Sequence, residues 1–383
     1  MAATANEILA DLILQNHLQL QRLASHEYQK MLKILTELAK ELVKQMITID
    51  PTAPGHLRYR NERAAKLMSK SQRKISKYFA EMLREFRSDM YELATLEANF
   101  AVNSLSSVTG IAISRAMTAE QMRAVVNSTY IEGGLLKDWF SRASQGYMLA
   151  FRKEIRAGMV AGEGIDKMIR RIIGSKREFP GDPSLYDKQK RGTEALVRTA
   201  VMSISNEARM AAFRANEDVI KGYQWLATLD DVTCLVCAVY DLKIWDTKAN
   251  PIGHDKEFKI SPIHWNCRCV ITPLTTIDEE RLARKQEGMG RSSQYGRVSR
   301  SMNFEKWLES MPPEKQQQII KNNIGKNRYE AWKEGKITFN DLITQKGRPL
   351  TLEELRADMN MGGSATSATG AKGAIPNNVS NDD

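Results

Sequence analysis

The run CLVC at residues 234–237 and the run HWNCRC at residues 264–269 contain all four cysteines of this 383-residue chain. Two thiol pairs and a histidine grouped so closely are typical ligands of a tetrahedral metal ion. A small domain that gains folding free energy from a bound metal needs only a modest hydrophobic core. The two runs therefore predict a compact, metal-stabilised domain in the second half of the chain.

Five side chains compete for the four positions of such a site: Cys234, Cys237, His264, Cys267 and Cys269. Either the four cysteines bind and the histidine lies outside, or the histidine replaces one of the last two cysteines. In extended chain the last two cysteines point to one face, so both sulfurs can meet the first pair. Zn2+ is the expected ion, because thiolate-rich tetrahedral sites suit it. The alternative is a cluster of buried free thiols, or a disulfide formed outside the cell.

The residues around the cysteines show both helical and strand patterns. Residues 187–216 carry a helical stripe, and residues 222–228 have the aromatic and β-rich composition typical of a strand. A tight turn is expected at the first cysteine pair, a second strand at residues 240–245 and a loop at residues 250–253. Together these elements predict a small α+β domain over residues 184–275.

The first half of the chain, residues 1–183, is predicted to be mainly α-helical. Apolar residues recur every three or four positions over residues 31–46, which is the stripe of an amphipathic helix. Residues 6–46 form either one helix of about 60 Å or two ordinary helices broken near Ser25-His26. The longer helix would favour an interaction arm.

Further signals divide this helical half. A second apolar stripe covers residues 75–93, and Thr118 with Gln121 has the spacing of a helix capping box. Residues 165–173 predict one more short helix. The run FPGDP at residues 179–183 is expected to be a linker, because proline and glycine end regular structure.

The chain after the α+β domain is predicted in three parts. Residues 276–302 are basic and contain Gly and Ser, so we expect a mobile connector that can touch DNA. Residues 303–361 predict a short helical segment with a capping box at residues 351–354. Residues 362–383 consist largely of Gly, Ser, Ala, Thr and Asn, which cannot bury a core, so disorder is expected there.

The charge of the chain favours anionic partners. It has 56 Lys and Arg against 46 Asp and Glu, a formal net charge of +10, and nucleic acid is the first partner to consider. Cations spread over three helical turns can follow a phosphate backbone, whereas the alternative is a solvated helix face. The residues expected to touch nonspecific double-stranded DNA are Lys66, Lys70, Arg73, Lys74, Lys77, Arg291 and Arg297.

Several classes of protein are disfavoured. The N-terminal residues lack the basic start and apolar core of a signal peptide, and no stretch reaches the ~18 apolar residues of a membrane span. We therefore expect no membrane partner and synthesis in a reducing cytoplasm, where clustered cysteines bind metal or stay reduced. The sequence has no Walker A motif and no Gly-x-Ser-x-Gly elbow.

One enzymatic alternative is a zinc-containing nuclease of the HNH type, in which cysteines brace a catalytic histidine. Such a site would use His254, Asp255 and His264. The other three histidines lie in the helical half, so a hydrolytic site would be short of bases. We therefore expect a protein without enzymatic activity.

The residues from Trp225 through DVTC at 231–234 to the HWNCRC run resemble the head morphogenesis, or Mu F-like, minor head proteins of tailed bacteriophages. The runs VRT at 197–199 and SNEAR at 205–209 also resemble that family, and the likeness is closest over residues 189–273. It implies a minor capsid protein that associates with the portal vertex. It also implies a part in head assembly and in DNA packaging or ejection.

The same resemblance implies partners and a location. The portal protein is the first expected partner, with the major capsid or scaffold proteins as further ones, and the N-terminal helices would serve as the docking arm. The protein would be made in the cytoplasm of the bacterial host and reside in the virion, inside the capsid at the portal vertex.

Two positions depart from the family pattern. Leu242 stands where the family often has a glycine after the Asp of its hairpin, which argues against a tight turn at Asp241. The family run Pro-Pro-x-His-Pro is SPIHW at residues 261–265, so two prolines are missing and a less rigid loop is expected.

Overall fold

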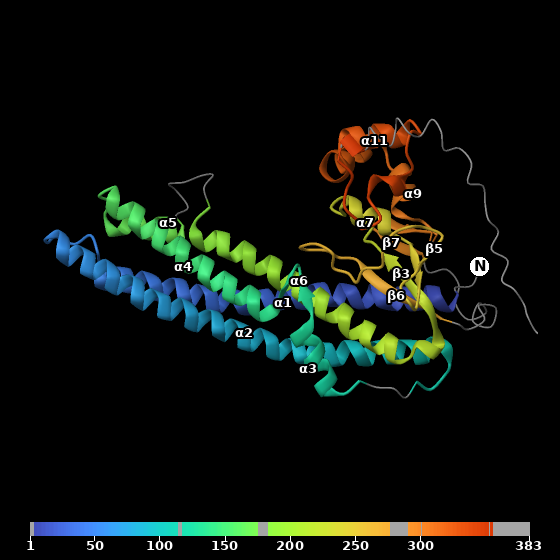
Figure 1. The fold of residues 1–383 in the computed structure, drawn as a ribbon, viewed down its shortest axis with the longest axis horizontal. Coiled ribbons are helices and arrows are strands. Elements are labelled where there is room, and N and C mark those ends of the chain that lie inside the picture. The colour runs from blue at the N-terminus through green and yellow to red at the C-terminus, as the bar shows by residue number, and fades with distance from the viewer. Residues whose placement is uncertain are drawn as a thin grey trace, which may run out of the picture.

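The computed structural model describes residues 4–113, 117–174, 183–275, 290–299, 301–351 and 353–354. Long helices lie side by side in an elongated bundle, and a small sheet and the short C-terminal helices gather at one end of it (Figure 1). The fold confirms the predicted class, which is a mainly α first half followed by a small α+β region that contains the Cys/His cluster. The expected linker at 179–183 and the expected disorder at 362–383 fall mostly or wholly outside the described residues.

Six helices form the bundle, and none of the described helices is long and apolar enough to cross a membrane. The first helix is unbroken over 45 residues, so the predicted break near Ser25-His26 is wrong. Both of those polar side chains are exposed, while Ala24 and Met31 continue the buried stripe past them. The helices are α1 (Ala5–Ile49), α2 (Leu57–Thr109), α3 (Ala119–Ser128), α4 (Leu136–Val160), α5 (Ile165–Ile173) and α6 (Leu185–Ala215).

Local sequence signals set several of the helix ends. Thr118 and Gln121 form the predicted capping box, in which each side chain accepts a hydrogen bond from the other residue's backbone N–H. Gly110 ends α2 with φ 69°, a left-handed conformation that suits glycine. Gly158 lets α4 and α5 approach closely, since a Cβ there would lie 2.6 Å from the side chain of Met168.

Helices α1 and α2 run antiparallel in a register that polar contacts fix. At one end Asn16 Nδ2 donates to Glu97 Oε1 over 2.8 Å, and at the other Lys74 Nζ lies 2.8 Å from Glu41 Oε2. Helix α6 packs on both α1 and α2, so it is shared between the bundle and the sheet region that follows it. We call residues 25–49, 57–90, 147–160 and α5 the arm, because they extend away from the sheet (Figure 1).

A four-stranded antiparallel sheet of order β5-β4-β3-β6 forms the core of the second region. Strand β3 confirms the strand predicted near residues 222–228, lies in the interior of the sheet and pairs with β6 through Trp225 opposite Ile271. The strand expected over residues 240–245 begins only at Ile244, and the loop expected at 250–253 contains a short strand. The strands are β3 (Ile220–Leu226), β4 (Ile244–Asp246), β5 (Pro251–Ile252) and β6 (Val270–Thr275).

The late strand start has a local cause. Residues 235–240 form a helix, α7 (Leu235–Tyr240), instead of a turn and strand. Cys234 caps this helix, because its sulfur accepts from the backbone N–H of Cys237 over 3.5 Å. The cap and the helix occupy the residues that the sequence pattern assigned to extended chain.

The C-terminal residues fold back onto the sheet region. Phe304, Trp307 and Leu308 are fully buried, and the short helical segment predicted at residues 303–361 includes a helix that begins at Pro313. The elements are β7 (Arg291–Ser293), β8 (Gly296–Val298), α9 (Phe304–Glu309), α10 (Pro313–Ile319), a π-helical turn (Ile320–Ile324), α11 (Lys326–Lys333) and a 3-10 turn (Phe339–Leu342). Three minor elements complete the fold: β1 (Tyr130–Ile131), β2 (Gly134–Leu135) and a 3-10 turn at Glu217–Val219.

A buried ion pair joins α2 to α6 inside the bundle. Arg209 Nη1 lies 2.6 Å from Glu97 Oε2, and the two side chains are 1% and 5% exposed. The second guanidinium nitrogen donates to Asn206 Oδ1 over 2.5 Å. Because both charges are desolvated, each depends on the other for its stability in the folded state.

This pair yields a stability prediction. Arg209→Met leaves the carboxylate of Glu97 buried without its cation, so we expect the free energy of unfolding to fall by about 3–5 kcal/mol. The double variant Glu97→Gln with Arg209→Met should recover part of that loss, because no charge is then stranded. Urea unfolding followed by helical circular dichroism measures both. Lys40→Gln, which breaks an exposed pair with Glu37, is the control and should keep the wild-type midpoint. An Arg209→Met variant as stable as the wild type would contradict the prediction.

Candidate metal centre

Two chain segments bring the five candidate ligands together. Cys234 and Cys237 lie at the start of α7, and Cys267 and Cys269 lie just before β6. His264 opens a turn in which the N–H of Cys267 donates to the His264 carbonyl over 3.1 Å. The strand pairing of β3 with β6 sets these two segments beside each other.

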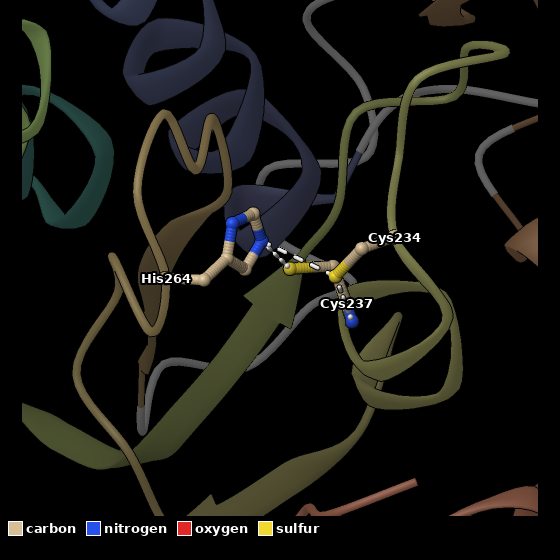
Figure 2. A group of neighbouring side chains, drawn as sticks. All are labelled: Cys234, Cys237 and His264. Atoms are coloured by element: carbon tan, nitrogen blue, oxygen red, sulfur yellow. Dashed lines mark hydrogen bonds between the residues drawn. The ribbon is translucent and has the colours of Figure 1, made fainter. Parts of the chain in front are cut away.

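The donor atoms form two overlapping groups. Cys234, Cys237 and His264 make one, and Cys237, Cys267 and Cys269 make the other; within each group the donor atoms lie within 4.8 Å of one another. His264 Nε2 points between two sulfurs, 3.2 Å from that of Cys234 and 3.1 Å from that of Cys237 (Figure 2). The sulfurs of Cys237 and Cys267 are 3.6 Å apart. Cys237 is therefore the centre of the cluster.

These distances and donor types fit a zinc ion. Two sulfurs bound at ~2.3 Å to a tetrahedral zinc lie about 3.8 Å apart, which is close to the 3.6 Å between Cys237 and Cys267. Cys237, Cys267 and Cys269 are buried and Cys234 is half-buried, as is typical of a closed structural site. Five donors still compete for four positions, so both predicted ligand sets remain compatible with the geometry.

The cluster also perturbs its own protonation. Hydrogen bonding from Cys237 and then His264 lowers the pKa of the Cys234 thiol to about 5. Burial works to lower the pKa of His264, but its hydrogen bonds to Cys234 and Cys267 raise that pKa to about 11. Burial raises the pKa of Cys269. The protonation states of these neighbouring side chains are therefore coupled to one another.

Backbone contacts hold the second ligand segment in place. Ser261 is fully buried, and its hydroxyl donates to the Cys269 carbonyl over 2.6 Å. Asn206 on α6 donates to the Ser261 carbonyl over 2.7 Å, and the N–H of Asn266 donates to Thr199 Oγ1 over 3.0 Å. The loop expected to be less rigid is therefore fixed by hydrogen bonds to α6, which compensate for the two missing prolines.

The hairpin next to the cluster forms a tight turn despite Leu242. This residue adopts φ 60°, in the left-handed region, and its N–H donates to the Trp225 carbonyl over 2.9 Å. The buried carboxylate of Asp241 accepts from the N–H groups of Ala227 and Phe304. The expectation that Leu242 argues against a turn is wrong, because these contacts outweigh the cost of a left-handed leucine.

The prediction that Arg291 contacts DNA is wrong, because this residue is buried. Its side chain is 4% exposed and lies 2.6 Å from Asp241, and it also donates to the Met302 carbonyl. It therefore anchors the C-terminal residues to the sheet region. The described part of the predicted connector, 290–299, is a β-hairpin, and Arg297 within it is exposed. Of the other residues predicted to contact DNA, Lys74 forms an ion pair with Glu41.

The residues of the nuclease alternative do not converge. His254 Nε2 lies 2.8 Å from the Ile244 carbonyl, and its Nδ1 accepts from the N–H of Lys256 over 3.1 Å. Asp255 contacts Lys256 and Asn340. Among the described residues, neither His254 nor Asp255 belongs to a group of metal ligands with His264.

Sequence reasoning missed the residues that position the cluster. Arg209 was noted only as the last residue of the SNEAR run, yet it is buried. Asn206 and Ser261 were noted only as parts of longer runs. Their role depends on contacts between residues more than 50 positions apart, which spacing along the chain does not reveal.

A comparison with known protein families finds a matching region in this chain. The family model described as phage Mu protein F like protein matches residues 150–272, from the middle of α4 into β6. The match covers about a third of the chain and supports the Mu F-like resemblance seen in the sequence, although it starts before residue 189. No curated protein and no solved structure matches the chain.

Leu242 provides a test of the strained turn. Leu242→Ala and Leu242→Gly remove the same packing, but only glycine tolerates the left-handed backbone without cost. We expect the glycine variant to be more stable than the alanine variant by about 1 kcal/mol. Urea unfolding of the two variants side by side gives the difference. Equal stability, or a more stable alanine variant, would show that the turn carries no backbone strain.

Proposed function

We propose that this protein is a minor capsid protein at the portal vertex of a tailed phage head, where it serves head assembly and DNA packaging or ejection. The observation that carries the proposal is the Mu F-like match over residues 150–272. The matched region includes α6, which packs directly on α1 and α2. The family region and the long helices are therefore one mechanical unit, suited to linking one head component to another.

In this proposal the cysteine cluster is a structural clasp that binds Zn2+. When bound, zinc would supply folding free energy by joining the start of α7 to the chain before β6. The protein's own residues orient the donors: Ser261 holds the Cys269 carbonyl, and the His264 Nδ1 lies 2.9 Å from the Trp265 carbonyl. That second contact fixes the ring so that Nε2 faces the sulfurs.

The proposed clasp has no catalytic task. Its donors are largely buried, and His254, the other histidine of the region, has both ring nitrogens engaged with the backbone. A hydrolytic centre would instead need an open ligand position and a free general base. We therefore assign the site to stability and assembly.

The proposed partners are the portal protein first and the major capsid or scaffold proteins second, inside the virion. The arm offers a docking surface at its far turn, where large apolar side chains are exposed. Leu57 is 71% exposed and Tyr59 is 56% exposed. Exposed apolar and aromatic side chains of this kind are typical anchors of protein interfaces.

Metal content tests the clasp. Protein purified without added metal should contain about one equivalent of zinc, measured by inductively coupled plasma mass spectrometry. Cys237→Ser should abolish binding, because Cys237 belongs to both donor groups. His254→Gln is the matched control and should retain the metal. Comparing His264→Ala, Cys267→Ser and Cys269→Ser identifies the ligand set, because only the variants that lose a true ligand lose zinc. Wild-type protein with less than about a tenth of an equivalent would contradict the proposal.

Docking is tested by co-expression with the portal protein of the same phage. Removing residues 1–100 would delete α1 and most of α2 and so destroy the bundle, which makes a surface change the better test. The double variant Leu57→Ser with Tyr59→Ser removes one apolar and one aromatic anchor. It should therefore reduce the amount of co-purified portal protein by about tenfold or more. Leu96→Ser with Ile252→Ser changes exposed apolar residues elsewhere and is the control. Loss of binding only in the control pair would place the interface on another surface.

A further inference from the structure

The excess positive charge of the chain is concentrated at the far end of the arm. Residues 37–77 and 147–174 contain 16 Lys and Arg and seven Asp and Glu, whereas the whole chain has 56 and 46. The two ranges lie together, because the rings of Phe79 and Tyr147 are 6.1 Å apart. Nearly all of the formal charge of +10 therefore lies on the half of the arm remote from the sheet.

Part of this charge forms one straight stripe on α2. Lys66, Lys70, Arg73 and Lys77 follow one another at intervals of four, three and four residues, and all are exposed. At 100° per residue the four positions lie within about 60° of one another around the helix, over roughly 16 Å of its length. Arg84, also exposed, continues the line after a further seven residues.

Direct ion pairs do not neutralise these four cations in the described part of the chain, although the Glu41 carboxylate is near enough to interact with Lys77. In the part of the chain that the structure describes, none of the four has an ion-pair partner, whereas the adjacent Lys74 pairs with Glu41 of α1. Like charges three or four residues apart on a helix repel and lower its stability. The stripe is thus an electrostatic cost to the isolated protein that an anionic partner would relieve.

The surface around the stripe is polar and suits a polyanion. Ser69 and Ser76 flank the stripe on one side and are exposed, and their side chains can donate to phosphate oxygens. No large apolar side chain of α2 is exposed between Tyr59 and Leu96. A membrane surface or a protein interface would require apolar anchors among the charges, so a regular row of phosphates fits the stripe better.

We infer that the stripe of Lys66, Lys70, Arg73 and Lys77 binds the phosphate backbone of double-stranded DNA without reading its sequence. The stripe carries no side chains arranged to reach base edges in a groove, and backbone contacts alone are sequence-independent. The inference rests on the proposed function in one respect, which is that the DNA packaged in the phage head is the polyanion that the stripe binds. It gives the arm two surfaces, the apolar turn at Leu57 and Tyr59 and the basic stripe beside it.

The test uses the full-length protein and a fluorescently labelled 30-base-pair duplex, with binding followed by anisotropy from 50 to 200 mM salt. Replacing the four cations by glutamine should weaken binding at 100 mM salt by roughly 100-fold or more. The slope of log affinity against log salt should become shallower by about 3 to 4, since each phosphate contact contributes ~0.9. Two duplexes of different sequence should bind equally.

A charge-matched variant is the control. Lys221→Gln, Lys248→Gln, Lys306→Gln and Lys346→Gln remove four exposed cations outside the arm and outside the predicted DNA-contacting set, and should leave the slope nearly unchanged. Circular dichroism melting checks that both quadruple variants fold.

An unchanged slope in the stripe variant, or an equal loss of affinity in the control variant, would overturn the inference. Equally tight binding of wild-type protein to poly-glutamate or to anionic phosphatidylserine vesicles would overturn the choice of DNA. Because no other head protein is present, failure here would leave the portal proposal intact.

Discussion

The buried ion pair between Glu97 and Arg209 is the contact on which the rest of the structure depends. Arg209 also donates to Asn206, and Asn206 donates to the Ser261 carbonyl, beside the segment that carries Cys267 and Cys269. One continuous series of hydrogen bonds therefore runs from α2 through α6 to the segment that carries the Cys/His cluster. Its members are almost fully buried, so a group that lost its partner would remain desolvated without a hydrogen bond. We therefore expect the series to form as a unit.

This connection explains why the family region and the long helices act together. The Mu F-like match ends in β6, but α6, which positions the loop that carries Cys267 and Cys269, packs against α1 and α2, and both of these helices lie outside the match. The C-terminal residues are attached in a similar way, because Arg291 and the N–H of Phe304 both bind the buried carboxylate of Asp241. The sheet region is thus connected to α6 by the hydrogen bond from Asn206 to the Ser261 carbonyl, and to the C-terminal residues by the ion pair between Arg291 and Asp241.

Periodicity and capping chemistry predicted most of the helices. The stripe in α1, the capping box at Thr118 and the short helix α5 formed as expected, because each depends on residues within one or two turns. Predictions that depended on distant partners were less successful. The residues after Cys234 form a helix capped by a thiolate-forming side chain, and Arg291 pairs with a residue 50 positions away. Neither partner is visible from the local pattern.

The sequence by itself determined which thiols and imidazole are grouped and the family resemblance of that region, because cysteine spacing and the surrounding run are properties of one short stretch of chain. It also determined where the long helices lie, since an apolar stripe requires only local regularity. Tertiary structure alone decided which cations are available. Among the described residues, Lys66 and Lys70 have no ion-pair partner on their exposed face, while Lys74 and Arg291 are neutralised by carboxylates from other elements. The number and order of the charged residues are properties of the sequence, but which of them form ion pairs depends on which surfaces the fold brings together.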